Sequence, residues 1–216
     1  MHQSAALPRR SLETISMWAL IITIAATLFV VVPSVSVPFL ATKSFILATG
    51  ALIVFALYIL ARLSRGNIVF PPLLLTLALW LPVIAYALSS AFSGIPFNQA
   101  LWGVMLEPDT LGFMLVAAFL GTLTVLIVRR PDQYQSFLRI FAVVSGLVIV
   151  VQTATILLGQ VMPATVSPTF SLLGSFQDLC SFLGLSIVGI LVTLRFVDLS
   201  LITKRVLIGV GILGLF

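Results

Sequence analysis

Seven blocks of apolar residues, each with at most one charged residue, follow one another along this chain and limit what it can fold into. They cover residues 15–32, 45–61, 69–92, 110–128, 137–158, 176–194 and 206–216. An α-helix rises about 1.5 Å per residue and the hydrocarbon core of a bilayer is about 30 Å thick, so one span needs roughly 17 to 25 residues. The first six blocks are long enough, and the seventh is not. We therefore predict an all-α fold, a polytopic transmembrane helix bundle with six complete spans plus a truncated seventh.

The composition excludes a water-soluble fold. Apolar residues make up 61% of the 216 residues and charged residues only 8%, whereas soluble domains contain about 45–50% and about 25%. Lipid cannot satisfy bare backbone polar groups, so blocks of this length form helices unless they close into a barrel, and the alternating pattern of a barrel is absent. The 11 basic residues lie in short linkers and form no stripe with interleaved aromatics. We therefore expect membrane lipids, and no nucleic acid, as partners.

The two ends of the chain lead to different expectations. Residues 1–14 are predicted to be a cytoplasmic N-terminal tail, and residues 15–216 a transmembrane helical domain. The first block is longer than the core of a signal peptide, roughly 7 to 15 residues, so an uncleaved first span is preferred over a cleaved signal. The last block stops after about 16 Å of helical rise with no anchor behind it. We therefore expect the chain to be C-terminally truncated.

The basic residues also predict the orientation, because Lys and Arg near the ends of spans stay on the cytoplasmic side. If the spans alternate in direction, ten of the 11 basic residues fall on one side and only Lys43 on the other. The ten are Arg9, Arg10, Arg62, Arg65, Arg129, Arg130, Arg139, Arg195, Lys204 and Arg205. The N-terminus is therefore predicted to be cytoplasmic, with external loops near residues 33–43, 93–109 and 159–175.

Polar residues at the predicted outer ends of spans are the candidates for a site. Glu107 and Asp109 precede the fourth block, and paired carboxylates can perform acid–base chemistry or bind a cation. The alternative is two solvated loop acids, with Asp109 or Thr110 capping the helix that follows. Gln177 and Asp178 open the sixth block. An acid at membrane depth is a functional candidate, but an acid in a first helical turn also interacts favourably with the helix dipole.

The remaining polar residues suggest little chemistry. Gln152 lies inside the fifth block, where such a group more often bonds across helices than touches a ligand. Arg139 near the inner start of that block can extend to the cytoplasmic headgroups. Cys180 and His2 are the only residues of their kinds, and Cys180 is expected to pack as a small residue. No metal-ligand spacing and no nucleotide or nucleophile motif is present, so we expect no metal and no cofactor, and the catalytic residues stay unknown.

Two stretches of the chain have a familiar order of residues. One reads Leu-Ser-Ser-Ala-Phe-Ser at residues 88–93 and Pro-Phe-Asn-Gln-Ala-Leu-Trp-Gly at residues 96–103. The other reads Leu-Gly-Ser-Phe at residues 173–176, followed by Leu179, Phe182 and Leu183. Both resemble the O-antigen ligase and O-antigen polymerase-like family, the first its helix end and glycine turn into the next span, the second its glycine-led start of the sixth span. The spacing resembles the family over most of the 216 residues.

This resemblance implies a bacterial inner-membrane enzyme that ligates or polymerises glycans from an undecaprenyl diphosphate carrier on the outer face, in the assembly of lipopolysaccharide or another cell-surface polysaccharide. It implies a lipid-linked glycan as ligand, no nucleotide sugar and, in the ligases, no metal. The chain departs from the family in having no Arg or Lys between Arg65 and Arg129, and Gln177-Asp178 where Asn-Pro is frequent. The family's large external loop, with its arginine and histidine for the diphosphate and the acceptor, would lie after Phe216.

The charges agree with the missing loop. A diphosphate held outside the membrane requires outward Arg or Lys, and only Lys43 lies on that side, so we expect the chain as given to be inactive. The alternative is a non-enzymatic polytopic protein such as a transporter half or an envelope assembly subunit. A transporter would gather polar groups at the bilayer midplane on broken helices, and only Gln152 and a kink expected at Pro82 fit. The glycan, the acceptor and the oligomeric state stay open.

Overall fold

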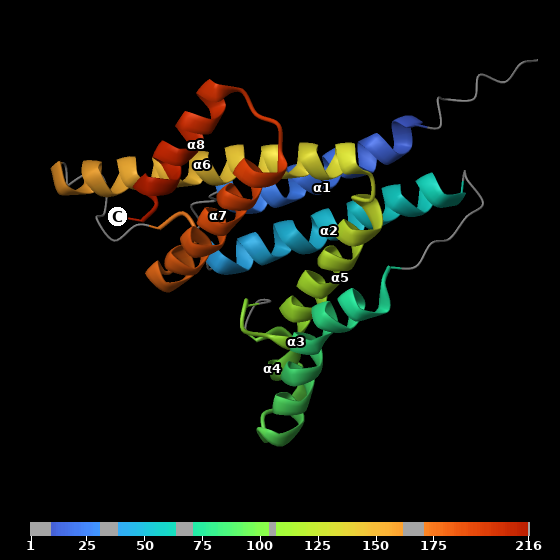
Figure 1. The fold of residues 1–216 in the computed structure, drawn as a ribbon. Coiled ribbons are helices and arrows are strands. Elements are labelled where there is room, and N and C mark those ends of the chain that lie inside the picture. Colours follow the sequence, from blue (N-terminus) through green and yellow to red (C-terminus); the bar gives the residue numbers. More distant parts are fainter. Residues whose placement is uncertain (1–9, 31–38, 64–70, 104–106, 162–170, 216) are drawn as a thin grey trace, which may run out of the picture. The chain divides into compact units, whose positions relative to one another are not determined.

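The computed structural model describes residues 10–30, 39–63, 71–103, 107–161 and 171–215. All regular structure in these residues is helical, and no strand occurs among them. Figure 1 shows the helices, which are α1 (Arg10–Phe29), α2 (Phe39–Leu63), α3 (Leu73–Phe92), α4 (Phe97–Trp102), α5 (Leu111–Ile127), α6 (Pro131–Val161), α7 (Phe176–Phe196) and α8 (Leu201–Leu213). The predicted all-α fold is confirmed.

Five of these helices, α1, α2, α3, α6 and α7, are long and apolar enough to cross a membrane. The apolar helix α5 has 17 residues, which rise about 26 Å and fall short of a hydrocarbon core of about 30 Å. The protein is therefore a multi-pass membrane protein. Within the described residues it has five helices of full spanning length and a shorter sixth, where the sequence predicts six complete spans.

The outer surface of the spans is apolar, as contact with lipid requires. Helix α3 is the extreme case, because only 6% of its span is buried inside the protein. Its residues Leu73, Leu74 and Phe92 are among the most exposed large side chains of the chain. Soluble proteins rarely present so continuous an apolar face to water, so this surface supports membrane lipids as the surrounding partner.

Several helix ends differ from the predicted ones. Helix α1 begins at Arg10, so residues 10–14 of the predicted tail are helical, and α2 begins at Phe39, which places Lys43 in a helix instead of a loop. Helix α6 begins at Pro131, where the missing N–H of proline is harmless. The short helix α4 lies in a predicted external loop. Hydropathy marks the part of a helix that lipid accepts, whereas backbone hydrogen bonding decides where the helix ends.

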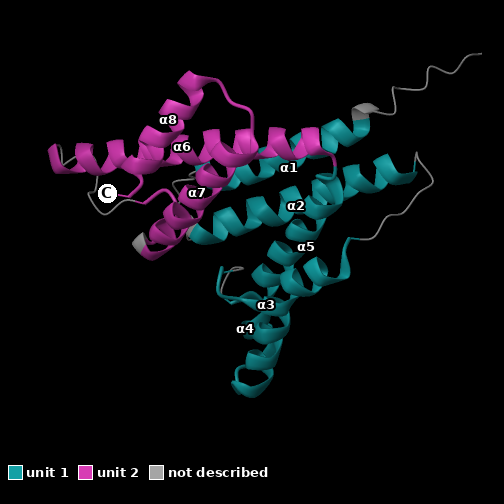
Figure 2. Cartoon of the chain, in the orientation of Figure 1, with its two compact units in different colours: residues 1–129 teal, residues 130–216 magenta. Residues whose placement is uncertain are grey.

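The chain forms two compact units, Met1–Arg129 and Arg130–Phe216, coloured separately in Figure 2. Helices α1 to α5 belong to unit 1 and helices α6 to α8 to unit 2. The sequence predicts one transmembrane domain over residues 15–216. Each unit nevertheless has a buried apolar cluster of its own, so the helical domain consists of two packed parts.

In unit 1, α1 and α2 form an antiparallel hairpin. The two helices approach closely at Gly50, where an added Cβ would lie 2.6 Å from Oγ1 and 2.9 Å from Cβ of Thr23. Thr23 donates its hydroxyl hydrogen to the carbonyl oxygen of Ala19 at 2.8 Å. Where α1 starts and α2 ends, the carboxylate of Glu13 lies 3.9 Å from the guanidinium of Arg62. A small residue thus permits the close contact, as is common between membrane helices.

Helices α3 and α5 form the second pair of unit 1. Val83, Leu111 and Ala118 make its buried cluster, and the indole nitrogen of Trp80 donates to the hydroxyl of Thr122 at 3.2 Å. Pro82 lies inside α3, which remains helical on both sides of it. The kink expected at Pro82 therefore does not end the helix.

In unit 2, α6 and α7 run antiparallel in a register that two contacts define. The hydroxyl of Thr193 donates to the carbonyl oxygen of Leu138 at 3.3 Å and to that of Gly189 at 2.7 Å. Gly189 faces the ring of Phe141, whose Cδ1 would lie 3.0 Å from an added Cβ. The buried cluster, which includes one residue of α8, consists of Ala142, Ile149, Ile190 and Leu207.

Candidate functional site

Lys43, the basic residue expected on the outer side, is part of the packed hairpin of unit 1. Its ammonium group donates to the carbonyl oxygens of Thr27 and Leu28, both at 2.9 Å, and the residue is only 7% exposed. The last carbonyls of a helix have no partner within it and carry the negative end of the helix dipole. Lys43 therefore caps the C-terminal end of α1, and its role is structural before any other.

Glu107 and Asp109 lie in the turn that leads into α5. The carbonyl oxygen of Glu107 accepts from the hydroxyl and the amide of Thr110, at 2.7 Å and 3.2 Å. The Thr110 hydroxyl oxygen accepts from the amide of Phe113 at 3.3 Å, so Thr110 is the N-cap of α5. The sequence left Asp109 and Thr110 as alternative N-caps, and the structure shows that Thr110 is the N-cap and Asp109 is not. Asp109 is exposed, while Glu107 is half-buried beside Gly103, whose φ of +59° is in the left-handed region.

Asp178 closes a capping box at the start of α7. The amide of Asp178 donates to the hydroxyl oxygen of Ser175 at 3.1 Å, and Oδ2 of Asp178 accepts from the amide of Ser175 at 3.2 Å and from its hydroxyl at 2.6 Å. These reciprocal bonds satisfy amides that the helix itself leaves unpaired. The interpretation of Asp178 as a first-turn residue near the helix dipole is confirmed. Gln177 and Asp178 are both exposed.

Gln152 holds this turn to α6. The residue is 2% exposed, and its Oε1 accepts from the amide of Leu172 at 3.0 Å. The amide of Gly174 donates to the carbonyl oxygen of Ser171 at 3.3 Å, and Gly174 has a φ of +118°, which favours glycine. Gln152 was expected to bond across helices, and the bond to Leu172 joins it to the segment before α7. Residues 173–176 are consequently a structured turn.

The four predicted site residues belong to two different units. Glu107 and Asp109 lie in unit 1, and Gln177 and Asp178 lie in unit 2. Each pair stands at the start of one helix and offers carboxylate or amide groups that can bond to hydroxyl groups. Among the described residues, no group of three or more His, Cys, Asp and Glu side chains could hold a metal ion.

Two buried hydroxyls in unit 2 were not predicted. Ser145 on α6 and Ser186 on α7 are each 0% exposed, and neither hydroxyl has a hydrogen-bond partner among the described residues. Ser145 lies about two turns beyond Leu138, and Ser186 about two turns before Thr193, so both continue the faces that meet at that bond. Cys180, expected to pack, is exposed on α7. A sequence cannot show which small polar residues face a neighbouring helix.

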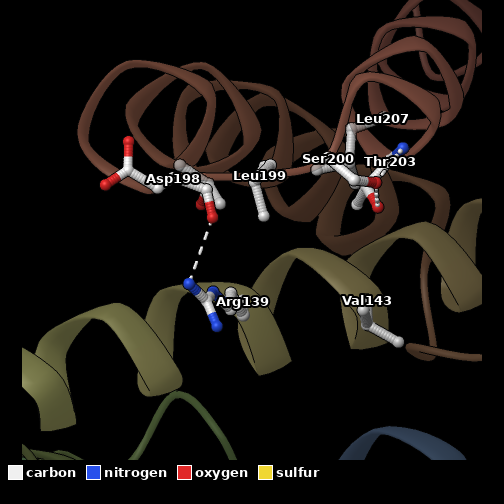
Figure 3. A pocket seen from close by; sticks show the side chains of 8 residues that line it. Arg139, Val143, Asp198, Leu199, Ser200, Thr203 and Leu207 are labelled. Atoms are coloured by element: carbon white, nitrogen blue, oxygen red, sulfur yellow. Dashed lines mark hydrogen bonds between the residues drawn. The ribbon is translucent and has the colours of Figure 1, made fainter.

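A pocket of about 300 Å³ in unit 2 was also missed (Figure 3). Its lining residues are Arg139, Val143, Thr193, Asp198, Leu199, Ser200, Thr203 and Leu207. The signal in the sequence was a single arginine at the inner start of a span. The residues that face it come from the connection between α7 and α8, which lies far from Arg139 along the chain, so the sequence alone could not assemble this pocket.

Comparison with known proteins yields no relative: no protein-family profile, no curated protein and no solved structure matches the chain. The similarity to the O-antigen ligase family therefore rests on the two stretches of sequence alone. The structure adds where those stretches lie. The first covers the end of α3 and all of α4, and the second covers the capped start of α7.

Proposed function

We propose that this chain is the N-terminal membrane part of a ligase or polymerase of lipid-linked glycans that works on the outer face of the bacterial inner membrane. With a cytoplasmic N-terminus, as the distribution of basic residues favours, α4 and the starts of α5 and α7 lie on the outer side. The observation that carries the proposal is the turn before α7. The stretch that resembles the ligase family is held to α6 by Gln152 and closed by the bonds between Ser175 and Asp178.

A glycan at this turn would meet hydrogen-bonding groups more than cations. Gln177 and Asp178 are exposed, and amide and carboxylate groups can bond to sugar hydroxyls. Lys43 is bonded to carbonyl oxygens of α1, so it is poorly placed to bind a diphosphate, which calls for Arg or Lys. In this proposal the chain positions the carrier lipid and the sugar, and another segment supplies the cations that act on the diphosphate.

A non-enzymatic role, as a transporter half or an envelope assembly subunit, is the second candidate. The observation that favours it is that polar groups at three helix ends all serve the fold. Lys43 caps the end of α1, Thr110 begins α5, and Asp178 completes the capping box of α7. A scaffold needs such groups whether or not any chemistry takes place on it.

Glycan transfer in cells separates the two candidates. Deleting the natural gene that encodes this chain is expected to leave carrier-linked glycan in the membrane and the acceptor unmodified, and the intact gene restores transfer. Surface glycan is measured by gel electrophoresis and the carrier-linked pool by mass spectrometry. Normal transfer without the gene would refute the enzymatic proposal and leave the scaffold role.

A matched pair of variants tests the turn itself. In Asp178→Asn the amide oxygen can still accept the bonds from Ser175, so the fold is expected to persist while the charge is lost. We expect transfer to fall about tenfold at equal protein level, the cost of about 1.4 kcal/mol in transition-state binding. Asp132→Asn removes an acid from the first turn of α6, at the predicted cytoplasmic end, and is expected to leave transfer unchanged. Equal transfer by both variants would exclude Asp178 from the glycan site.

A further inference from the structure

The pocket of unit 2 combines one cationic group with an apolar wall. Figure 3 shows Arg139 on α6 facing the connection between α7 and α8, and Val143 lies one turn further along α6. Leu199 and Leu207 line it with Val143, while Thr193, Ser200 and Thr203 contribute hydroxyl groups. Its volume of about 300 Å³ is at the lower end of the range for small-ligand sites, roughly 300–1,000 Å³. A ligand that fits must have an anionic part and an apolar part.

Within the part of the chain that the structure describes, the guanidinium of Arg139 is not neutralised by an acid. It donates to the backbone carbonyl oxygen of Asp198 at 3.1 Å, and Figure 3 shows the Asp198 carboxylate pointing away from it. Among the described residues no carboxylate lies within ion-pair distance of Arg139. A guanidinium has several N–H donors in a fork that matches the oxygens of a phosphate. Since the carbonyl oxygen of Asp198 accepts only one of these N–H groups, Arg139 can bind an anion in its present position.

The surrounding residues add positive charge and donors. Ser200 is the N-cap of α8, where its hydroxyl oxygen accepts from the amide of Thr203 at 3.2 Å. The two hydroxyl groups lie 2.8 Å apart, at the positive end of the helix dipole. The same segments carry Arg195 in the last turn of α7 and Lys204 in α8. The electrostatic character of this end of unit 2 therefore complements an anion.

The depth of Arg139 in the membrane indicates which anion. Residues 140–161 of α6 contain no charged side chain and rise about 33 Å, which matches a hydrocarbon core of about 30 Å. Arg139 is the first charged residue beyond this stretch, so it lies at the level of the lipid phosphates. Val143, one turn deeper on the same face, is 60% exposed and lies at the level of the acyl chains.

We propose that this pocket binds an anionic phospholipid, with its phosphate on the guanidinium of Arg139 and the hydroxyl of Thr203, and an acyl chain along Val143. Basic pockets between transmembrane helices recognise anionic headgroups in this way. A zwitterionic lipid would bring its ammonium group close to the basic residues of α7 and α8. Soluble phosphate would leave the apolar wall unfilled. The proposal is independent of glycan transfer, because it concerns the opposite end of the helices from the turn before α7.

The test is lipid binding by the full-length chain purified in a mild detergent, titrated with phosphatidylglycerol or phosphatidylcholine and followed by native mass spectrometry. Phosphatidylglycerol is expected to bind at least tenfold more tightly. Arg139→Gln is expected to weaken its binding at least tenfold, because the phosphate loses its charge-assisted hydrogen bonds to the guanidinium. The affinity of Arg139→Lys for phosphatidylglycerol is expected to lie between those of the natural protein and Arg139→Gln, because an ammonium group keeps the charge but lacks the forked N–H donors of a guanidinium. Arg205→Gln removes the same charge outside the pocket lining and is expected to weaken binding less than twofold.

Several outcomes would overturn the proposal. Equal weakening by Arg139→Gln and Arg205→Gln would mean that only surface charge attracts the lipid, and equal affinity for both lipids would exclude headgroup recognition. Inorganic phosphate that competes as well as phosphatidylglycerol would assign the pocket to a soluble anion. Val143→Phe narrows the pocket without changing charge or the buried cluster of unit 2, so it provides the test if Arg139→Gln does not fold. It is expected to weaken phosphatidylglycerol binding, and unchanged binding would exclude the acyl-chain position.

Discussion

Replacing Gln152 by leucine would remove the bond between α6 and the turn that precedes α7. Gln152 is 2% exposed and Leu172 is 7% exposed, and the amide of Leu172 donates to Oε1 of Gln152 at 3.0 Å. Leucine has a similar size but no acceptor. In Gln152→Leu the amide hydrogen of Leu172 would stay buried and lose this acceptor.

The expected loss follows from what that amide can do instead. Removing one partner of a buried hydrogen bond costs about 1–3 kcal/mol. Side-chain hydrogen bonds between membrane helices average only about 0.6 kcal/mol, because the same groups also find hydrogen-bond partners in the unfolded state within the membrane. Leu172 belongs to a turn, so its amide has no partner within a helix. We therefore expect Gln152→Leu to lower the free energy of opening this turn by about 1–2 kcal/mol.

Hydrogen exchange of the amides of residues 171–175, in detergent micelles, measures this directly. A loss of about 1–2 kcal/mol corresponds to exchange that is roughly 5 to 30 times faster. Thr155→Val is the control, because the Thr155 hydroxyl donates to the carbonyl oxygen of Val151 within α6 at 2.8 Å and not to the turn. In Thr155→Val the amides of residues 171–175 are expected to exchange at the same rates as in the natural protein.

Unchanged exchange in Gln152→Leu would refute the claim that Gln152 holds the turn. Faster exchange in both variants would instead attribute the effect to a general weakening of α6. Faster exchange in Gln152→Leu alone, together with a normal rate in the middle of α6, is the predicted result.

Three further predictions concern packing and helix ends. Each is measured as the free energy of unfolding, from a titration with a denaturing detergent. Gly50→Ala is expected to lower the free energy of unfolding by about 1–3 kcal/mol, because the new Cβ would overlap Thr23. The control Gly184→Ala adds a Cβ in open space and is expected to raise the free energy of unfolding by up to about 1 kcal/mol. Equal effects of the two substitutions would contradict the packing argument. Lys43→Met is expected to cost about 1 kcal/mol because the end of α1 loses its cation, with Lys43→Arg as the charge-preserving control. Asp178→Ala is expected to cost about 0.5–1 kcal/mol through the capping box, and a neutral result would contradict that role.

Part of the candidate site was predictable because helix starts have a local signature. A serine followed three positions later by an acid predicts a capping box, and Ser175 with Asp178 forms one. The choice between Asp109 and Thr110 was not predictable in the same way. Either side chain can cap a helix, and the backbone conformation of the turn selects Thr110.

Lys43 shows where a helix boundary predicted from the sequence was wrong. An apolar pattern that starts at Phe45 suggests a loop before it, so Lys43 was expected to lie at the end of an external loop. The structure extends α2 back to Phe39, which lets the ammonium group reach the carbonyl oxygens at the end of α1. The end of a neighbouring helix is a tertiary feature, and no local pattern around Lys43 indicates it.

The sequence by itself determined that this protein is helical and lies in a membrane, because lipid imposes a rule on length and apolarity that can be read along one dimension. Only the tertiary structure decided which distant groups meet, as in the bonds of Gln152 with Leu172 and Arg139 with Asp198. Apolar helices of similar composition can pair in many ways. The choice among those pairings depends on side-chain shape and on a few polar bonds between segments far apart in the chain, and hydropathy contains no information about either.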